Sequence, residues 1–202
     1  MRQQAVTPLS ALDAIFTRRS VRAYERRKID DATVRSLLDA AVQAPTAVHM
    51  EPWAFVVIQD EAMLRRYSDL AKAGWIAEAA KYRLLHHEPA PGSGFAERLT
   101  DPQFSVFYDA GTLIVICAKP MGPFVAADCW LAAENLMLAA SALGLGTCCI
   151  GSAVAALNAP DVKAELHIPD DVTVVVPIVV GVPAGGGTDV PRKEPEILFW
   201  KR

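Results

Sequence analysis

The spacing of apolar and polar positions predicts that the chain begins with two helices joined by a basic segment. Residues 8–17 fit a first helix, because Ser10 and Asp13 form a capping box and apolar residues recur on one face. That apolar stripe consists of Leu12, Ile15 and Phe16. Asp30 can cap the second helix, and segment 18–28 is predicted to be a loop or a short extended piece. The inward face of the second helix is expected to be Val34, Leu37, Leu38, Ala41 and Val42.

Three further apolar runs predict strands. Trp53–Ile58 is apolar, aromatic and β-branched, which favours a buried strand, and Thr112–Ala118 has two apolar faces. Val172–Val182 is a long β-branched run and is predicted to be a central strand, in which Pro177 indicates a bulge or a sheet margin. Asp60 is expected to cap a further helix over residues 60–72. Its inward side chains are expected to be Leu64, Tyr67 and Leu70.

The segment Ala126–Leu143 predicts a long helix that is rich in alanine and leucine around its whole circumference. A helix that is apolar on every side must be buried on every side. In a chain of this size, packing against a second subunit is one way to bury it. Gly144 suits the glycine position that ends such a helix. The polar residues Asp128, Glu134 and Asn135 argue against a membrane span.

The composition fits a single soluble domain. The chain has 202 residues, of which 52% are hydrophobic and 21% are charged, so one α/β or α+β domain over residues 1–202 is expected. The formal net charge of −3 gives no general reason to expect a nucleic acid as partner. Neither the four cysteines nor the four histidines show a metal-binding spacing, and the N-terminus leads into no apolar leader. We therefore expect reduced thiols in a soluble cytoplasmic protein without a membrane partner.

The densest chemistry lies in the basic segment, where Arg18, Arg19, Ser20 and Arg22 directly follow the first helix. Guanidinium groups bind phosphate oxygens through two parallel hydrogen bonds, and a hydroxyl adds one donor, so the segment is a candidate phosphate site. A solvated basic loop is an equal alternative, and a nucleic-acid contact is a remote one. The apolar residues interleaved with the arginines argue against a freely solvated run.

Two other segments have the composition of ligand-binding turns. Residues 44–53 combine small residues and two prolines before a strand, so their backbone amides can approach a ligand, although an ordinary helix-to-strand connection looks the same. Residues 144–151 contain three glycines, but Cys149 stands where a dinucleotide fingerprint needs its third glycine, and the cluster follows a helix. We therefore reject a Rossmann site. Gly151 can let backbone N–H groups approach a flat ligand.

Taken in order, four motifs resemble the nitroreductase family of FMN-dependent flavoproteins. The family's Arg-Arg-Ser-x-Arg-x-aromatic motif is similar to Arg18–Tyr24, and its Ala-Pro-Ser/Thr-Ala-x-Asn-x-Gln-Pro-Trp motif is similar to Ala44–Trp53. The family's long helix with Gly-Leu-Gly is similar to Asp128–Gly146. Its closing Gly-x-Pro and basic tail are similar to Gly181–Pro183 and Arg192–Lys193. The similarity covers nearly the whole chain.

The resemblance implies a three-layer α+β fold with a mainly antiparallel central sheet flanked by helices. It also implies an intertwined homodimer with two FMN molecules at the interface. The residues implied on the phosphate side are Arg18, Arg19, Ser20, Arg192 and Lys193, with Arg22 near the ribityl chain or the pyrimidine edge. Those implied beside the ring are Pro45, Thr46, Ala47 and His49 from the other subunit, together with Cys149, Ile150 and Gly151.

The implied activity is hydride transfer from NADH or NADPH through FMN to nitroaromatic, quinone or similar electron-poor acceptors. Because flavin supplies the hydride chemistry, no catalytic side chain is assigned. The alternatives are reductive dehalogenation, enal or enone reduction, flavin fragmentation, and a dimer that binds FMN without turnover. His49 and Glu51 replace the family's frequent Asn and Gln. The replacement either alters the acceptor preference or the flavin potential, or is merely tolerated at the dimer interface. Residues 74–105 match no family pattern and are expected to form a variable lid or substrate segment.

Overall fold

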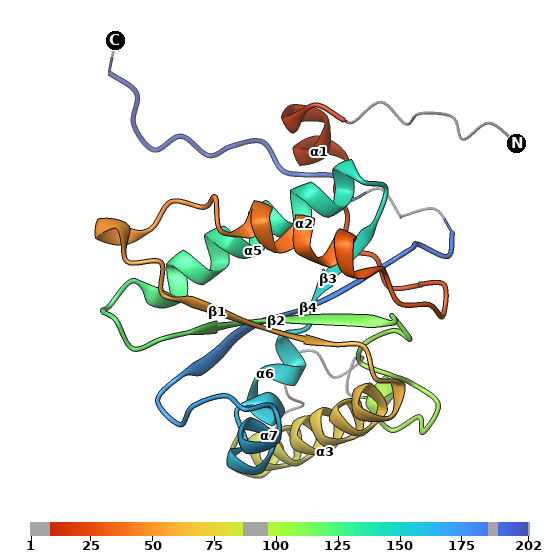
Figure 1. Cartoon of the computed structure of the whole chain (residues 1–202). Coiled ribbons are helices and arrows are strands. Elements are labelled where there is room, and N and C mark those ends of the chain that lie inside the picture. The colour runs from red at the N-terminus through yellow and green to blue at the C-terminus, as the bar shows by residue number, and fades with distance from the viewer. Residues whose placement is uncertain (1–8, 87–96, 186–189, 202) are drawn as a thin grey trace, which may run out of the picture.

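The computed structural model describes residues 9–86, 97–185 and 190–201. The strands are β1 (Trp53–Ile58), β2 (Thr112–Ala118), β3 (Gly146–Cys149) and β4 (Thr173–Gly181). The α-helices are α1 (Ala11–Thr17), α2 (Asp31–Ala41), α3 (Glu61–His86), α5 (Val125–Ala142), α6 (Val154–Leu157) and α7 (Pro160–Glu165). Two short 3-10 helices are η1 (Ala47–His49) and η2 (Gly151–Ala153). The strands form one antiparallel sheet, with α1, α2 and α5 over one face and α3, α6 and α7 over the other (Figure 1). This confirms the three-layer α+β fold class.

The strand order in the sheet is β1-β2-β4-β3, so β2 and β4 are its central strands. Every residue of β2 is buried, and the prediction that β4 is central is confirmed. β1 differs from the prediction, because it lies at an edge and half of its side chains are only partly buried. Pro177 pairs with Val115, and the register shifts between Ile116 and Cys117 just beside it. This is the bulge that a proline without an N–H group predicts inside a sheet.

Alternation along β2 divides the protein interior into two cores. Leu113, Val115 and Cys117 point toward the layer of α3, where they join a cluster with Tyr67 and Phe107. Their neighbours point the opposite way, because successive side chains of a strand alternate between its faces. The second cluster, under α2 and α5, contains Ile114, Ile116, Leu37, Leu136 and Ile178. A single strand therefore contributes to both hydrophobic layers.

The helices α1 and α5 form where they are predicted but leave apolar side chains uncovered. Ser10 and Asp13 form the predicted capping box of α1, yet the stripe of this helix faces solvent and Phe16 is 72% exposed. α5 buries one face, whereas Trp130 and Leu131 are 49% and 45% exposed. One chain alone therefore covers only one face of α5, and burial of its other face, for instance by a second subunit, stays a prediction. None of the helices described is both long and apolar enough to cross a membrane.

The end of α5 follows the predicted geometry. Gly144 has a φ of +73°, the left-handed conformation that favours glycine. The N–H of Leu145 donates to the carbonyl of Ala140 at 2.8 Å, and the N–H of Gly144 donates to Ser141 at 3.0 Å. These two bonds form a Schellman motif, which ends the helix and directs the chain into β3.

α3 is longer than predicted, because it continues past residue 72 and ends at His86. Its buried stripe includes Leu64, Tyr67 and Ala71, as helical spacing requires. Leu70 is exposed, contrary to the prediction. It follows Leu64 by six residues, which places its side chain roughly 120° away from that of Leu64 around the helix axis. Within the predicted lid segment, residues 87–96 lie outside the described residues, so its role stays a prediction.

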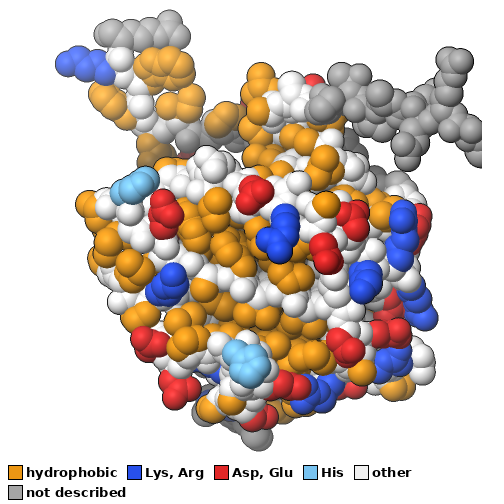
Figure 2. All heavy atoms as spheres, viewed as in Figure 1, with side chains coloured by type: hydrophobic (Ala, Val, Ile, Leu, Met, Phe, Trp, Pro, Cys, Tyr) orange, Lys and Arg blue, Asp and Glu red, His pale blue; other side chains and the backbone are white. Residues whose placement is uncertain are grey.

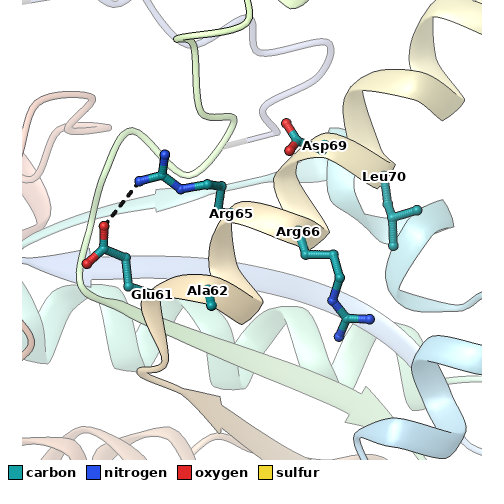
Figure 3. A pocket seen from close by; sticks show the side chains of 6 residues that line it. All are labelled: Glu61, Ala62, Arg65, Arg66, Asp69 and Leu70. Carbon is teal, nitrogen blue, oxygen red and sulfur yellow. Dashed lines mark hydrogen bonds and ion pairs between the residues drawn. The ribbon is translucent and has the colours of Figure 1, made fainter.

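A polar cluster joins α3 to α7. Arg66 points from the outer surface of α3 toward α7, on the other side from the Arg65–Glu61 ion pair (Figure 3). There it forms an ion pair with Glu165, which also accepts a hydrogen bond from the hydroxyl of Tyr67 at 2.8 Å. The hydrogen bonds from Arg66 and then Tyr67 lower the pKa of Glu165. Burial and the bond to Glu165 raise the pKa of Tyr67 to about 12.

This cluster predicts a loss of stability in acid. Because the folded state lowers the pKa of Glu165, its contribution is complete above the ordinary carboxyl pKa and disappears as the pH falls through the folded value. The free energy of unfolding of Glu165→Gln, measured with urea, should therefore lie below that of the wild type at pH 7. The difference should shrink toward pH 3. Glu61→Gln, at an exposed i,i+4 pair, should show a much smaller effect. A Glu165→Gln difference independent of pH would contradict the assignment.

Candidate functional site

The basic segment after α1 is extended and lies along the outer edge of the sheet. Ser20 forms a parallel bridge with Thr147 of β3, and the N–H of Val21 donates to the carbonyl of Thr147 at 2.9 Å. Further on, the N–H of Glu25 donates to Val182 at 2.9 Å. The segment is thus the short extended piece that the sequence predicts. Its backbone is fixed against β3 and the end of β4, so the arginine side chains start from a rigid base.

Small residues of the sheet allow this close approach. A Cβ atom added to Gly146 would lie 2.8 Å from the Cβ of Val21, which no native packing allows. A Cβ at Gly181 would lie 3.0 Å from the Cδ1 atom of Tyr24. The ring of Tyr24 is buried, its hydroxyl donates to the carbonyl of Val21 at 2.8 Å, and burial raises its pKa. The two glycines and Tyr24 therefore fix the path of residues 20–24.

The three arginines of the motif are held differently. The Arg18 side chain is only 19% exposed, and its Nε lies 3.6 Å from a carboxylate oxygen of Glu134 on α5. Arg19 folds back over the end of α1 and donates to the carbonyl of Phe16 at 2.7 Å. Arg22 is exposed at the surface near the exposed Ser20. The Arg18 guanidinium therefore lies against α5, and its charge lies close to Cys149.

The predicted ring-side residues follow β3. Cys149 is partly buried, its Sγ lies 3.6 Å from the Sδ of Met137, and burial raises its pKa to about 11. The N–H of Ile150 donates to the carbonyl of Pro177 at 2.8 Å. Gly151 is exposed, no atom lies within 4 Å of an added Cβ, and its N–H has no acceptor in the described part of the chain. Gly151 therefore offers open space and a free N–H donor two residues after Cys149.

The third predicted segment, the turn 46–51, has an unusual backbone. Val48, His49 and Glu51 have φ angles of 45°, 60° and 46°. The His49 side chain is 92% exposed, and its Nε2 lies 3.6 Å from a carboxylate oxygen of Glu51. The N–H of Ala47 donates to the carboxylate of Asp128 on α5 at 3.2 Å. The sequence marked Asp128 as one of few polar residues in an apolar helix, but not as a partner of this turn.

The structure does not bring all the predicted residues together within one chain. The turn 46–51 leads into β1 at one edge of the sheet, whereas the basic segment and Cys149–Gly151 adjoin β3 at the other edge (Figure 1). With β2 and β4 between them and strands spaced about 4.8 Å apart, the two edges lie roughly 14 Å apart. Arg192 and Lys193 lie in an exposed extended segment that leaves the body of the molecule. The predicted site residues thus lie in three separate regions of one chain: the turn, the basic edge and the C-terminal segment.

Comparison with known proteins identifies the family. Residues 15–182 match the model of the nitroreductase family, so the chain belongs to that family. It is 28% identical over 177 residues to a protein from Archaeoglobus fulgidus that is provisionally named an NADH dehydrogenase/NAD(P)H nitroreductase. The aligned region covers 85% of this chain and 84% of that protein. A nitroreductase with bound FMN from Bacteroides fragilis has a similar structure, with a TM-score of 0.76, 26% identity, and coverage of 95% of this chain and 97% of that one.

The same fold also occurs in an enzyme with another reaction. An iodotyrosine deiodinase bound to FMN and 3-iodo-L-tyrosine has a TM-score of 0.72 to this structure, covering 95% of this chain and all of that one. The two sequences are 21% identical, so this similarity extends to the fold alone. Family membership therefore makes this chain an oxidoreductase of the nitroreductase type and leaves its acceptor to be determined.

Proposed function

We infer that two copies of this chain form an FMN-dependent oxidoreductase, which passes hydride from NADH or NADPH to nitroaromatic, quinone or similar electron-poor acceptors. The observation that carries this proposal is the arrangement of the family-matched residues. Ser20 pairs with Thr147 of β3, the charge of Arg18 acts on Cys149 at the end of that strand, and Gly151 follows two residues later. This order along one sheet edge is what a phosphate side and a ring side would require. The FMN bound to the similar Bacteroides fragilis nitroreductase supports the choice of cofactor.

The donors on this edge fit FMN chemically. A phosphate dianion needs cations and hydrogen-bond donors, and Arg18, Arg19, Arg22 and Ser20 offer both within five residues. Bound FMN would supply the hydride chemistry. Arg18 and Ser20 would hold the phosphate, and the Gly151 N–H would face the ring. Arg19 would have to leave the carbonyls at the end of α1 to join them.

A dimer would complete the site, because one chain holds its two halves on opposite sheet edges. A two-fold axis places the same patch of both subunits in contact, and so can bring Pro45, Thr46, Ala47 and His49 of one copy to the basic edge of the other. Apolar side chains for such an interface project from α1 and from the C-terminal segment (Figure 2). The exposed residues are Leu12, Ile15 and Phe16 of α1, Trp130 and Leu131 of α5, and Ile197, Leu198, Phe199 and Trp200. Exposed apolar patches of this kind mark interaction surfaces.

The first test of this proposal is an absorbance spectrum of the purified protein, recorded before and after anaerobic addition of NADH or NADPH. Flavin bands that bleach with the nicotinamide and return with a nitroaromatic or quinone acceptor would support the proposed activity. Bands that never bleach would instead indicate a dimer that binds FMN without turnover. A colourless protein that takes up no added FMN would contradict the proposal.

The phosphate contact is tested by Arg18→Ala. If Arg18 makes a charged hydrogen bond to FMN, its loss should weaken binding by about 1.5–3 kcal/mol, which is roughly 10- to 150-fold in Kd. The measurement is a fluorescence titration of the apoprotein with FMN. Arg35→Ala removes an exposed arginine from α2 and serves as the matched control, with no change expected. Equal affinities in the two variants would remove Arg18 from the site.

A further inference from the structure

The turn 46–51 has a strained backbone although its tip is exposed to solvent. Three non-glycine residues, Val48, His49 and Glu51, have positive φ angles. For β-branched Val48 this conformation is a true outlier, because its Cβ crowds the backbone. Yet Val48 is 88% exposed and the His49 side chain is 92% exposed, so packing of these two side chains against the described residues does little to offset the strain. Strained residues of this kind persist where they serve a contact with something else.

The buried carboxylate of Asp128 on α5 holds the turn in place. Asp128 is 4% exposed, lies in the first turn of α5, and accepts a hydrogen bond from the N–H of Ala47 at 3.2 Å. A buried carboxylate is costly unless it is well partnered, and its position at a helix N-terminus lowers that cost. A second bond, from the N–H of Glu51 to the Oγ1 of Thr46 at 3.3 Å, closes the turn. The bond from Ala47 to Asp128 thus attaches the turn to the rigid long helix.

We propose that Asp128 is a positioning residue that holds the turn 46–51 in its strained form, so that the exposed tip at Val48 and His49 contacts the flavin site of a second copy. This inference rests on the proposed function, because only a dimer brings the turn to the basic edge. It assigns a role to Asp128, which would affect flavin binding by holding the backbone of Ala47 and would not contact the flavin itself. It also explains why strain is kept in an exposed turn.

The test compares Asp128→Ala, Asp128→Asn and Asn135→Ala. Asn135 is a matched control, because it also lies on α5 and donates a 3.3 Å hydrogen bond, but to the carbonyl of Ala40 on α2. Two quantities are measured on each dimeric protein: the hydrogen exchange of the Ala47 amide, and the Kd for FMN by fluorescence titration. In Asp128→Ala we expect both the exchange rate and the Kd to rise about tenfold or more, as loss of a charged hydrogen bond implies.

The conservative variant separates positioning from general stability. Asp128→Asn keeps an oxygen acceptor for the Ala47 N–H, so it should restore most of the exchange protection and most of the FMN affinity. Asn135→Ala should lower the unfolding midpoint but leave both quantities near the wild-type values. If Asp128→Ala and Asn135→Ala weaken FMN binding equally, Asp128 acts through stability alone and the proposal is wrong.

A second variant covers the case in which Asp128→Ala folds poorly. Val48→Gly removes an exposed side chain and relieves a positive φ, so its unfolding midpoint should stay the same or rise. Its Kd for FMN should nevertheless rise, by roughly fivefold if about 1 kcal/mol of contact is lost. Unchanged FMN affinity would overturn the proposal for the turn. A wild-type protein that binds no FMN would instead overturn the proposed function itself.

Discussion

Gly111→Ala is expected to lower the free energy of unfolding by about 3 kcal/mol or more. A Cβ at this position would lie 2.4 Å from the carbonyl carbon and oxygen of Arg27 and 2.5 Å from the N of Lys28. All three are backbone atoms, so no side-chain rotation can relieve the overlap. The contact also holds the end of the basic segment, since the N–H of Ile29 donates to the hydroxyl of Thr112 at 3.3 Å. Residues 27–29 would have to move away from β2.

Urea unfolding of Gly111→Ala and Gly74→Ala measures this effect against a matched control. Gly74 lies inside α3, and no atom is within 4 Å of an added Cβ. Alanine there should raise the free energy of unfolding by about 0.5–1 kcal/mol, because glycine is the poorer helix former. The same substitution is therefore expected to have opposite signs at the two sites. A Gly111→Ala protein as stable as the wild type would show that residues 27–29 do not pack against Gly111.

The two-residue period of strands and the caps of helices made much of the fold predictable. β2 and β4 are apolar on both faces, and this is the pattern of strands covered by helices on both sides. Asp30 accepts a hydrogen bond from the N–H of Thr33 at 2.8 Å and so caps α2 as predicted. Close approaches such as Gly111 against Arg27 leave no local pattern, because the partner residue is far away in the sequence.

The parts of the site were predictable, but their distances were not. Motifs show which residue types occur and in which order, and the basic segment does lie beside Thr147 and Cys149. Nothing local indicates that the turn 46–51 precedes a strand on the opposite edge of the sheet. Asp128 shows the same limit. It is one of two acids in an apolar helix, and its partner, the amide of Ala47, is 81 residues away in the sequence.

The exposed face of α5 gives the other large expected effect. In the proposed dimer, Leu131 lies in the interface, whereas in the isolated chain it is 45% exposed and contributes little to the fold. Leu131→Glu would bury an unpaired charge in each copy, at a cost of about 3–5 kcal/mol per charge. We expect this variant to sediment as a single chain of 21.8 kDa and to lose bound FMN, because the two halves of the site separate.

Leu70→Glu is the control for this experiment. Leu70 is 41% exposed on α3, in the helical layer on the other side of the sheet and outside the predicted lid segment, so a charge there should leave both association and FMN binding unchanged. Analytical ultracentrifugation gives the mass of each protein, and the flavin absorbance gives its occupancy. A Leu131→Glu protein that stays dimeric would place the interface away from α5. A monomeric variant that still holds FMN tightly would mean that one chain completes the site alone, and the turn 46–51 would then need another partner.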